Sequence, residues 1–117
     1  MSLKSVILFA FLLTLVQCKN IIQGLVEVDG SVRNVYNLRT EAYAIPFIKR
    51  DHDIHYDITR EYGPISNELI KGIAIRELGD GSSEAALTAG GVGYKFVDIH
   101  LESERGSGYK YSIEIFA

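Results

Sequence analysis

The feature that most constrains the fold of this chain of 117 residues is the alternation of apolar and polar side chains. Every second residue is apolar in Val97–Glu102 and again in Tyr109–Ile115, and the loop Glu104–Gly108 between these runs contains two glycines. Side chains two residues apart lie on the same face of a β-strand, so the pattern predicts strands with one buried face. Two alternating runs joined by a short loop that contains glycine predict a β-hairpin.

The alternation also predicts which side chains are buried. Ile99 and Ile113 take core positions, whereas Lys110 lies outside. In the run Ile54–Ile58 the apolar residues face inward, so His55 faces solvent. A shift of one residue in register would exchange the buried and exposed positions of a whole strand.

Further strands are predicted along the chain by the same criterion. Ser66–Leu78 fits both a helix capped by Ser66 and a strand, and we interpret it as mostly strand from Ile70 because Gly72 interrupts the helical pattern. Two predicted strands, Ile21–Val28 and Val32–Tyr36, flank a turn at Asp29-Gly30. A third is Tyr43–Lys49, where Pro46 indicates a sheet edge or a bulge. A fourth is Glu84–Thr88. Seven or eight short strands predict an all-β, mostly antiparallel domain, built as a small sandwich or barrel.

The N-terminus has a different pattern. Lys4 supplies one positive charge, and an apolar run of 11 residues, Val6–Val16, follows with a single threonine in it. A membrane-spanning helix needs about 20 apolar residues, so this run is too short to remain in a bilayer. The pattern predicts a secretory signal peptide over 1–18, cleaved after Cys18, and a β domain over 19–117. We therefore expect a secreted, extracellular protein that is not held at a membrane after cleavage.

Composition and charge exclude several function classes. Without residues 1–18 the chain has 11 Lys and Arg against 15 Asp and Glu, a net charge of −4, and its densest basic stretch is Lys49-Arg50. This balance gives no electrostatic basis for direct binding of nucleic acid. Apolar residues make up 42 of the remaining 99, an ordinary globular share. The one cysteine, Cys18, leaves with the predicted signal peptide, so we expect a domain without disulfides.

The segment Asp51–Asp57 gathers two of the three histidines among three carboxylates. Imidazole and carboxylate groups are ligands for zinc and similar metals, so the candidate metal-binding residues are Asp53 and His55, with His100 as a third ligand. Only side chains on one face of a strand converge, and Asp53 and Asp57 lie about 13 Å apart at about 3.3 Å per residue. We interpret the segment as a solvated strand face and expect neither a cofactor nor a functional metal site.

Sequence signatures of catalysis are not found. The chain has no Gly-x-Ser-x-Gly elbow of the kind that carries a nucleophilic serine. Gly90, Gly91 and Gly93 form a glycine-rich turn but lack the Lys-Ser/Thr pair of a phosphate-binding loop. We therefore assign no catalytic and no cofactor-binding residue, and we expect a protein that is not an enzyme.

The C-terminal half carries a set of four segments in a recognisable order. These segments are Leu78–Ser83 (LGDGSS), Leu87–Tyr94 (LTAGGVGY), Val97–Tyr109 (VDIHLESERGSGY) and Ile113–Ala117 (IEIFA). Through them the chain resembles, over about Ile65 to Ala117, the insect multiprotein bridging factor 2 family, whose members often carry signal peptides and are also described as salivary secreted peptides. The resemblance implies a β-rich fold and carries over no catalytic or ligand residue. The family name comes from a transcriptional co-activator that bridges a nuclear receptor and a general transcription factor.

Three functions follow from these observations. The predicted signal peptide favours a secreted, non-enzymatic binding or carrier protein of saliva, haemolymph or another fluid, whose ligand is an unknown protein or small molecule. The family name favours a co-activator that bridges other proteins. A metal-assisted enzyme built on the histidine and carboxylate residues is a remote third alternative.

The signal peptide yields the first testable prediction. The mature protein should begin at Lys19 and be recovered outside the cell, because Val16 and Cys18 occupy the two cleavage-recognition positions. N-terminal sequencing of protein from the medium of expressing cells measures this directly. Recovery of the chain with Met1 in a nuclear fraction would contradict it.

Overall fold

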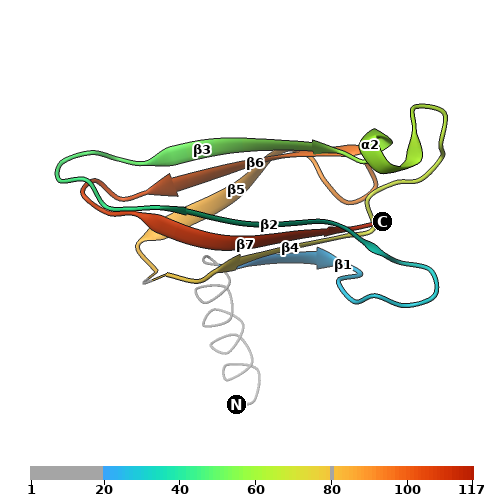
Figure 1. The fold of residues 1–117 in the computed structure, drawn as a ribbon, viewed down its shortest axis with the longest axis horizontal. Helices are drawn as coiled ribbons and strands as arrows, with labels where there is room; N and C mark the ends of the chain where they lie inside the picture. The colour runs from blue at the N-terminus through green and yellow to red at the C-terminus, as the bar shows by residue number, and fades with distance from the viewer. Residues whose placement is uncertain (1–19, 80) are drawn as a thin grey trace, which may run out of the picture.

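The structure, a computed structural model, describes residues 20–79 and 81–117 as two β-sheets that lie one above the other (Figure 1). The predicted signal peptide, residues 1–18, lies outside the described residues. No helix in the described ranges is long and apolar enough to span a membrane.

The lower sheet in Figure 1 has four antiparallel strands with β7 at its centre. β7 pairs with β4 on one side and with β2 on the other, so Ile113 lies opposite both Ile75 and Leu38. In spatial order the strands are β1 (Ile21–Gly24), β4 (Gly72–Glu77), β7 (Tyr109–Phe116) and β2 (Asn34–Ala42). The edges of this sheet are therefore β1 and β2.

The upper sheet has three antiparallel strands with β6 at its centre. The strands are, in spatial order, β3 (Asp51–Asp57), β6 (Phe96–Ser103) and β5 (Ser83–Gly90). The register between β5 and β6 shifts between Leu87 and Ala89, which is the mark of a β-bulge. A short helix, α2 (Thr59–Tyr62), follows β3 and begins the long connection to the lower sheet.

The inward faces of the two sheets form one hydrophobic core. The upper sheet contributes Ile54, Val97, Ile99 and Leu101, and the lower sheet contributes residues of β4 and β7, among them Ile113. Ile99 is 1% exposed and Ile113 is fully buried, while His55 and Lys110 are exposed, as the alternation predicts. The predicted all-β, mostly antiparallel fold is confirmed, and its form is a sandwich.

The predicted hairpin between Val97–Glu102 and Tyr109–Ile115 is wrong. Both runs are strands, but β6 belongs to the upper sheet and β7 to the lower one, and the loop Glu104–Gly108 carries the chain between the sheets. Alternation specifies which face of a strand is buried, and a strand in either sheet satisfies it by burying that face against the other sheet.

The predicted strand Tyr43–Lys49 is also wrong, because this segment turns. The N–H of Ile48 donates to the carbonyl of Ile45 at 3.1 Å, with Pro46 and Phe47 between them. Phe47 has φ 66°, a left-handed conformation far from the φ of about −120° to −140° of a regular β-strand. The segment is therefore a loop between β2 and β3.

Strand lengths near the N-terminus differ from the prediction as well. The predicted strand Ile21–Val28 ends at Gly24, which has φ 70°. The backbone of Gly24 lies so close to Lys71 that an added Cβ would be 2.1 Å from the Lys71 carbonyl oxygen. The turn at Asp29-Gly30 is present, but its flanking strands are not neighbours, since β1 and β2 lie at opposite edges of the lower sheet. The predicted strand Val32–Tyr36 begins at Asn34 and continues to Ala42.

The second testable prediction concerns the core. Ile113→Ala should lower the free energy of unfolding by about 2–5 kcal/mol, because it removes a fully buried side chain from the central strand. Lys110→Ala, on the exposed face of the same strand, should change it by less than about 0.5 kcal/mol. Urea unfolding of both variants measures the difference, and equal effects would show that the strand is shifted by one residue.

Candidate functional site

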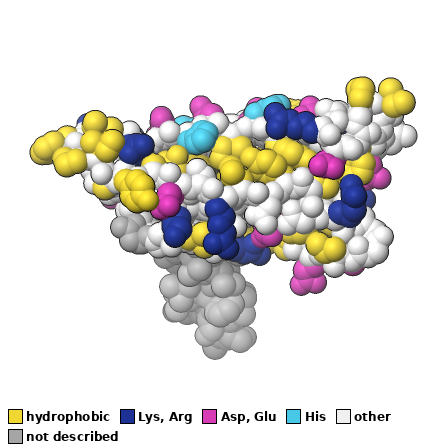
Figure 2. Space-filling model, viewed as in Figure 1, with side chains coloured by type: hydrophobic (Ala, Val, Ile, Leu, Met, Phe, Trp, Pro, Cys, Tyr) yellow, Lys and Arg dark blue, Asp and Glu magenta, His cyan; other side chains and the backbone are white. Residues whose placement is uncertain are grey.

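The outer face of the upper sheet carries histidine and carboxylate side chains on neighbouring strands. They alternate with the buried residues of β3 and β6, so the burial of the core places them in solvent. Figure 2 shows them along the upper edge of the molecule. The register between the two strands forms three cross-strand pairs, which are Asp51–Glu102, Asp53–His100 and His55–Asp98.

Two of these pairs are histidine–carboxylate contacts. His100 Nδ1 lies 2.6 Å from Asp53 Oδ1, and His55 Nδ1 contacts Asp98 Oδ1. The hydrogen bond to Asp53 raises the pKa of His100 above its usual value, because the carboxylate favours the protonated ring, and Glu102 adds to the effect. His100 therefore holds its proton to a higher pH than a free imidazole.

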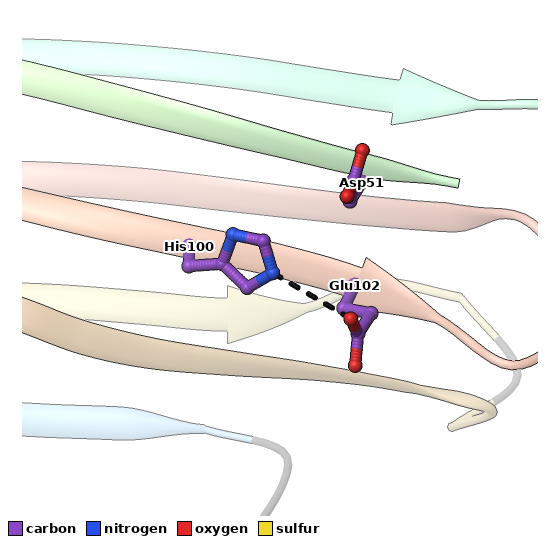
Figure 3. Close-up of side chains that lie close together, drawn as sticks. All are labelled: Asp51, His100 and Glu102. Atoms are coloured by element: carbon purple, nitrogen blue, oxygen red, sulfur yellow. Dashed lines mark ion pairs between the residues drawn. The ribbon is translucent and has the colours of Figure 1, made fainter. Parts of the chain in front are cut away.

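The first cross-strand pair and His100 form a cluster that we call the His100 cluster: Asp51, His100 and Glu102. Each residue offers one ligand atom, and these atoms all lie within 4.8 Å of one another. Figure 3 shows His100 and Glu102 side by side on β6, with His100 Nε2 3.7 Å from Glu102 Oε1, while Asp51 extends from β3. One imidazole and two carboxylates are a ligand set that zinc accepts.

Two features of the His100 cluster oppose metal binding. A metal binds the neutral imidazole, so it must displace a proton that Asp53 and Glu102 stabilise on the ring. The ammonium group of Lys49 also lies 3.4 Å from Glu102 Oε2 and partly neutralises that carboxylate. Protonation of His100 and the ammonium group of Lys49 thus both compete with a metal ion for this cluster.

The structure brings together only some of the residues that the sequence indicated. Asp53 and His100 are in contact, as a shared site requires, but His55 pairs with Asp98 in the next row along the strands. Asp51 and Glu102 were not among the candidates. The missing signal was the register between β3 and β6, because only that register shows that these two residues lie opposite each other and next to His100.

A second exposed feature is the loop between β2 and β3. Its four large exposed apolar side chains, which we call the apolar tip, are Tyr43, Ile45, Phe47 and Ile48. Tyr43 is 75% exposed and Phe47 is 83% exposed. Figure 2 shows hydrophobic side chains gathered at this end of the molecule. Clusters of exposed apolar side chains are typical of surfaces that bind other proteins.

Hydrogen bonds to the loop backbone hold the apolar tip in place. Arg105 Nη1 donates to the carbonyl of Phe47 at 3.0 Å, and the N–H of Gly106 donates to the carbonyl of Ile48 at 2.9 Å. Arg50 Nη1 donates to the carbonyl of Tyr43 at 2.6 Å. The loop thus rests on the connection between β6 and β7, and its side chains extend into solvent from a supported backbone.

Phe47 occupies a conformation that its side chain does not favour. In the described part of the chain it is the only residue other than glycine with a positive φ. It stands third in the turn Ile45–Ile48, where a positive φ is the mark of a type II turn and glycine or asparagine is usual. A left-handed backbone costs a residue such as phenylalanine about 1 kcal/mol or more, and its exposed ring regains little by packing.

The third testable prediction is that the His100 cluster binds zinc only weakly. Titration calorimetry should give a dissociation constant in the micromolar range or above, and zinc should leave the melting temperature unchanged, because the proton on His100 and Lys49 compete with the metal. His55→Ala serves as a matched control, since this histidine lies on the same face outside the cluster. Submicromolar binding that His100→Ala abolishes and His55→Ala leaves intact would contradict the prediction.

Comparison with known proteins places most of the chain in one family. The family model described as "Transcription activator MBF2" matches residues 31–117, which include β2 to β7. No curated protein and no solved structure matched the chain.

Proposed function

The chain belongs to the MBF2 family, and we propose that it is a non-enzymatic protein-binding domain that joins partner proteins, the kind of function that the family description as a transcription activator implies. In this proposal the apolar tip is the contact surface. An aromatic side chain that enters an apolar pocket of a partner is a common centre of binding energy in protein interfaces.

The observation that carries the proposal is the exposed, left-handed Phe47. A residue kept in an unfavourable conformation, without burial to compensate it, points to a role outside folding. The hydrogen bonds from Arg105, Gly106 and Arg50 keep the loop in the shape that presents the ring. A contact surface held in this way loses little conformational freedom when a partner binds.

The charge of the domain supports protein bridging over direct contact with DNA. Near the apolar tip the ammonium group of Lys49 pairs with Glu102, and Arg50 and Arg105 donate to backbone carbonyls of the tip. A protein with this charge would reach a promoter through other proteins, not through the phosphate backbone.

A second candidate function follows from residues 1–18. Their pattern predicts a signal peptide, so a secreted binding protein of the same family would use the apolar tip on a partner outside the cell. The family description and the N-terminal pattern thus favour different compartments, and both functions require the same contact surface.

The fourth testable prediction separates these functions. The full chain is expressed in cells that carry a reporter gene under a nuclear receptor, and an antibody against the domain locates it. The bridging function predicts a nuclear pool and a several-fold rise in reporter transcription. Reporter activity that stays at its basal level, with all of the chain in the medium and beginning at Lys19, would overturn the activator role and support the secreted binding protein.

Variants of the apolar tip test the contact surface itself. Phe47→Gly should abolish the reporter response and raise the free energy of unfolding by about 1 kcal/mol, because glycine adopts the left-handed conformation freely. Ile65→Ser is the matched control, since Ile65 is 95% exposed and lies outside the tip. An unchanged response in Phe47→Gly would exclude the apolar tip as the contact surface.

A further inference from the structure

β2 is the longest of the four edge strands in the two sheets, and its outer edge has no neighbouring strand among the described residues. Proteins protect free edges by making them short, by bulges, or by charged side chains, because an open edge pairs with other strands. β1 has only four residues, β5 contains the bulge near Leu87, and β3 carries three aspartates. β2 has nine residues; its register with β7 shifts near its start, between Asn34 and Tyr36, and is regular from there to Ala42.

The hydrogen bonds of β7 determine which backbone groups of β2 face that edge. The N–H groups of Leu78 and Lys71, which flank β4, donate to the carbonyls of Lys110 and Phe116 in β7. The even-numbered residues of β7 therefore direct their backbone N–H and C=O groups toward β4. The odd-numbered residues of β7 direct their backbone groups toward β2 instead. Their register partners, which include Leu38 and Thr40, therefore use their own backbone groups for pairing with β7. By alternation, the residues of β2 whose N–H and C=O groups face the open edge are Asn37, Arg39 and Glu41.

Arg39 and Glu41 are opposite charges on one exposed face of this edge. In the described part of the chain neither side chain has an ion-pair partner. Charges that are unpaired within one molecule and spaced two residues apart can pair across a two-fold axis, because a second antiparallel copy of the strand presents them in reverse order.

We propose that two copies of this chain pair antiparallel through β2, about a two-fold axis at Thr40. In this register Arg39 lies opposite Glu41 of the partner subunit and Glu41 opposite Arg39 of the partner subunit, so both ion pairs form. The edge-facing backbone groups of the two strands then meet as hydrogen-bonding partners, and the two threonines at the axis lie opposite each other, a favourable cross-strand pair. The two four-stranded sheets become one continuous sheet.

Other registers are less favourable on the same evidence. An axis at Arg39 places two arginines directly opposite each other, and like charges in that position are destabilising. An axis at Leu38 sets Arg39 opposite Asn37 and leaves Glu41 without a cation. The register about Thr40 is the one of these three that pairs both charges. The proposal does not depend on what the apolar tip binds.

Charge reversal provides the fifth testable prediction. Sedimentation equilibrium of the full chain should show twice the mass of one chain. Arg39→Glu and Glu41→Arg should each weaken the dimer at least about tenfold, because each variant sets like charges opposite each other at both positions. An equimolar mixture of the two variants should form a heterodimer, since one chain then carries two glutamates and the other two arginines.

Controls make each outcome decisive. Arg60→Glu reverses an exposed charge on the short helix α2, which follows the upper-sheet strand β3 and lies outside β2, and should leave the dimer unchanged. Circular dichroism of every variant should match that of the unaltered chain. A monomeric unaltered chain at its highest soluble concentration, a dimer that survives both single reversals, or two single variants that fail to associate when mixed would each overturn the proposal.

Discussion

The apolar contact between the two sheets is the interaction on which the rest of the structure depends. Ile99 from the upper sheet and Ile113 from the lower sheet are buried in the same core, and the strands that carry them are the central strands of their sheets. Since every second side chain of such a strand is buried, the remaining side chains must face solvent. Burial of every second side chain of β3 and β6 thus leaves the histidine and carboxylate side chains between them on the outer face of the upper sheet.

Alternation was sufficient to predict the buried faces, because it reports the environment of each side chain. It could not predict that β6 and β7 lie in different sheets, since pairing depends on residues far away in the sequence, such as Leu38 opposite Ile113. The turn at Phe47 was missed because a phenylalanine in a glycine position resembles a strand residue. At the histidine face, Asp53 and His100 could be named from residue type, whereas Asp51 and Glu102 required the register of β3 with β6.

The proposed contact surfaces occupy different parts of the sandwich and impose different demands on it. The apolar tip is a loop at one end of the molecule, and the open edge is the side of β2. A dimer through β2 would carry two apolar tips, so a partner with two binding sites would be held more tightly than a single contact allows. Activity would then depend on the concentration of the chain as well as on the affinity of each tip.

β7 is synthesised after both of the strands that it joins. β2 and β4 have no other common partner, and the pairing of Asn34 with Phe116 links opposite ends of the described sequence. Until β7 has emerged, β2 and β4 therefore remain separate and lack the strand that joins them. Sheets that close through such distant contacts fold slowly and are prone to aggregate until they close. Synthesis of β7, and not the emergence of the earlier strands, is the event that allows this sheet to close.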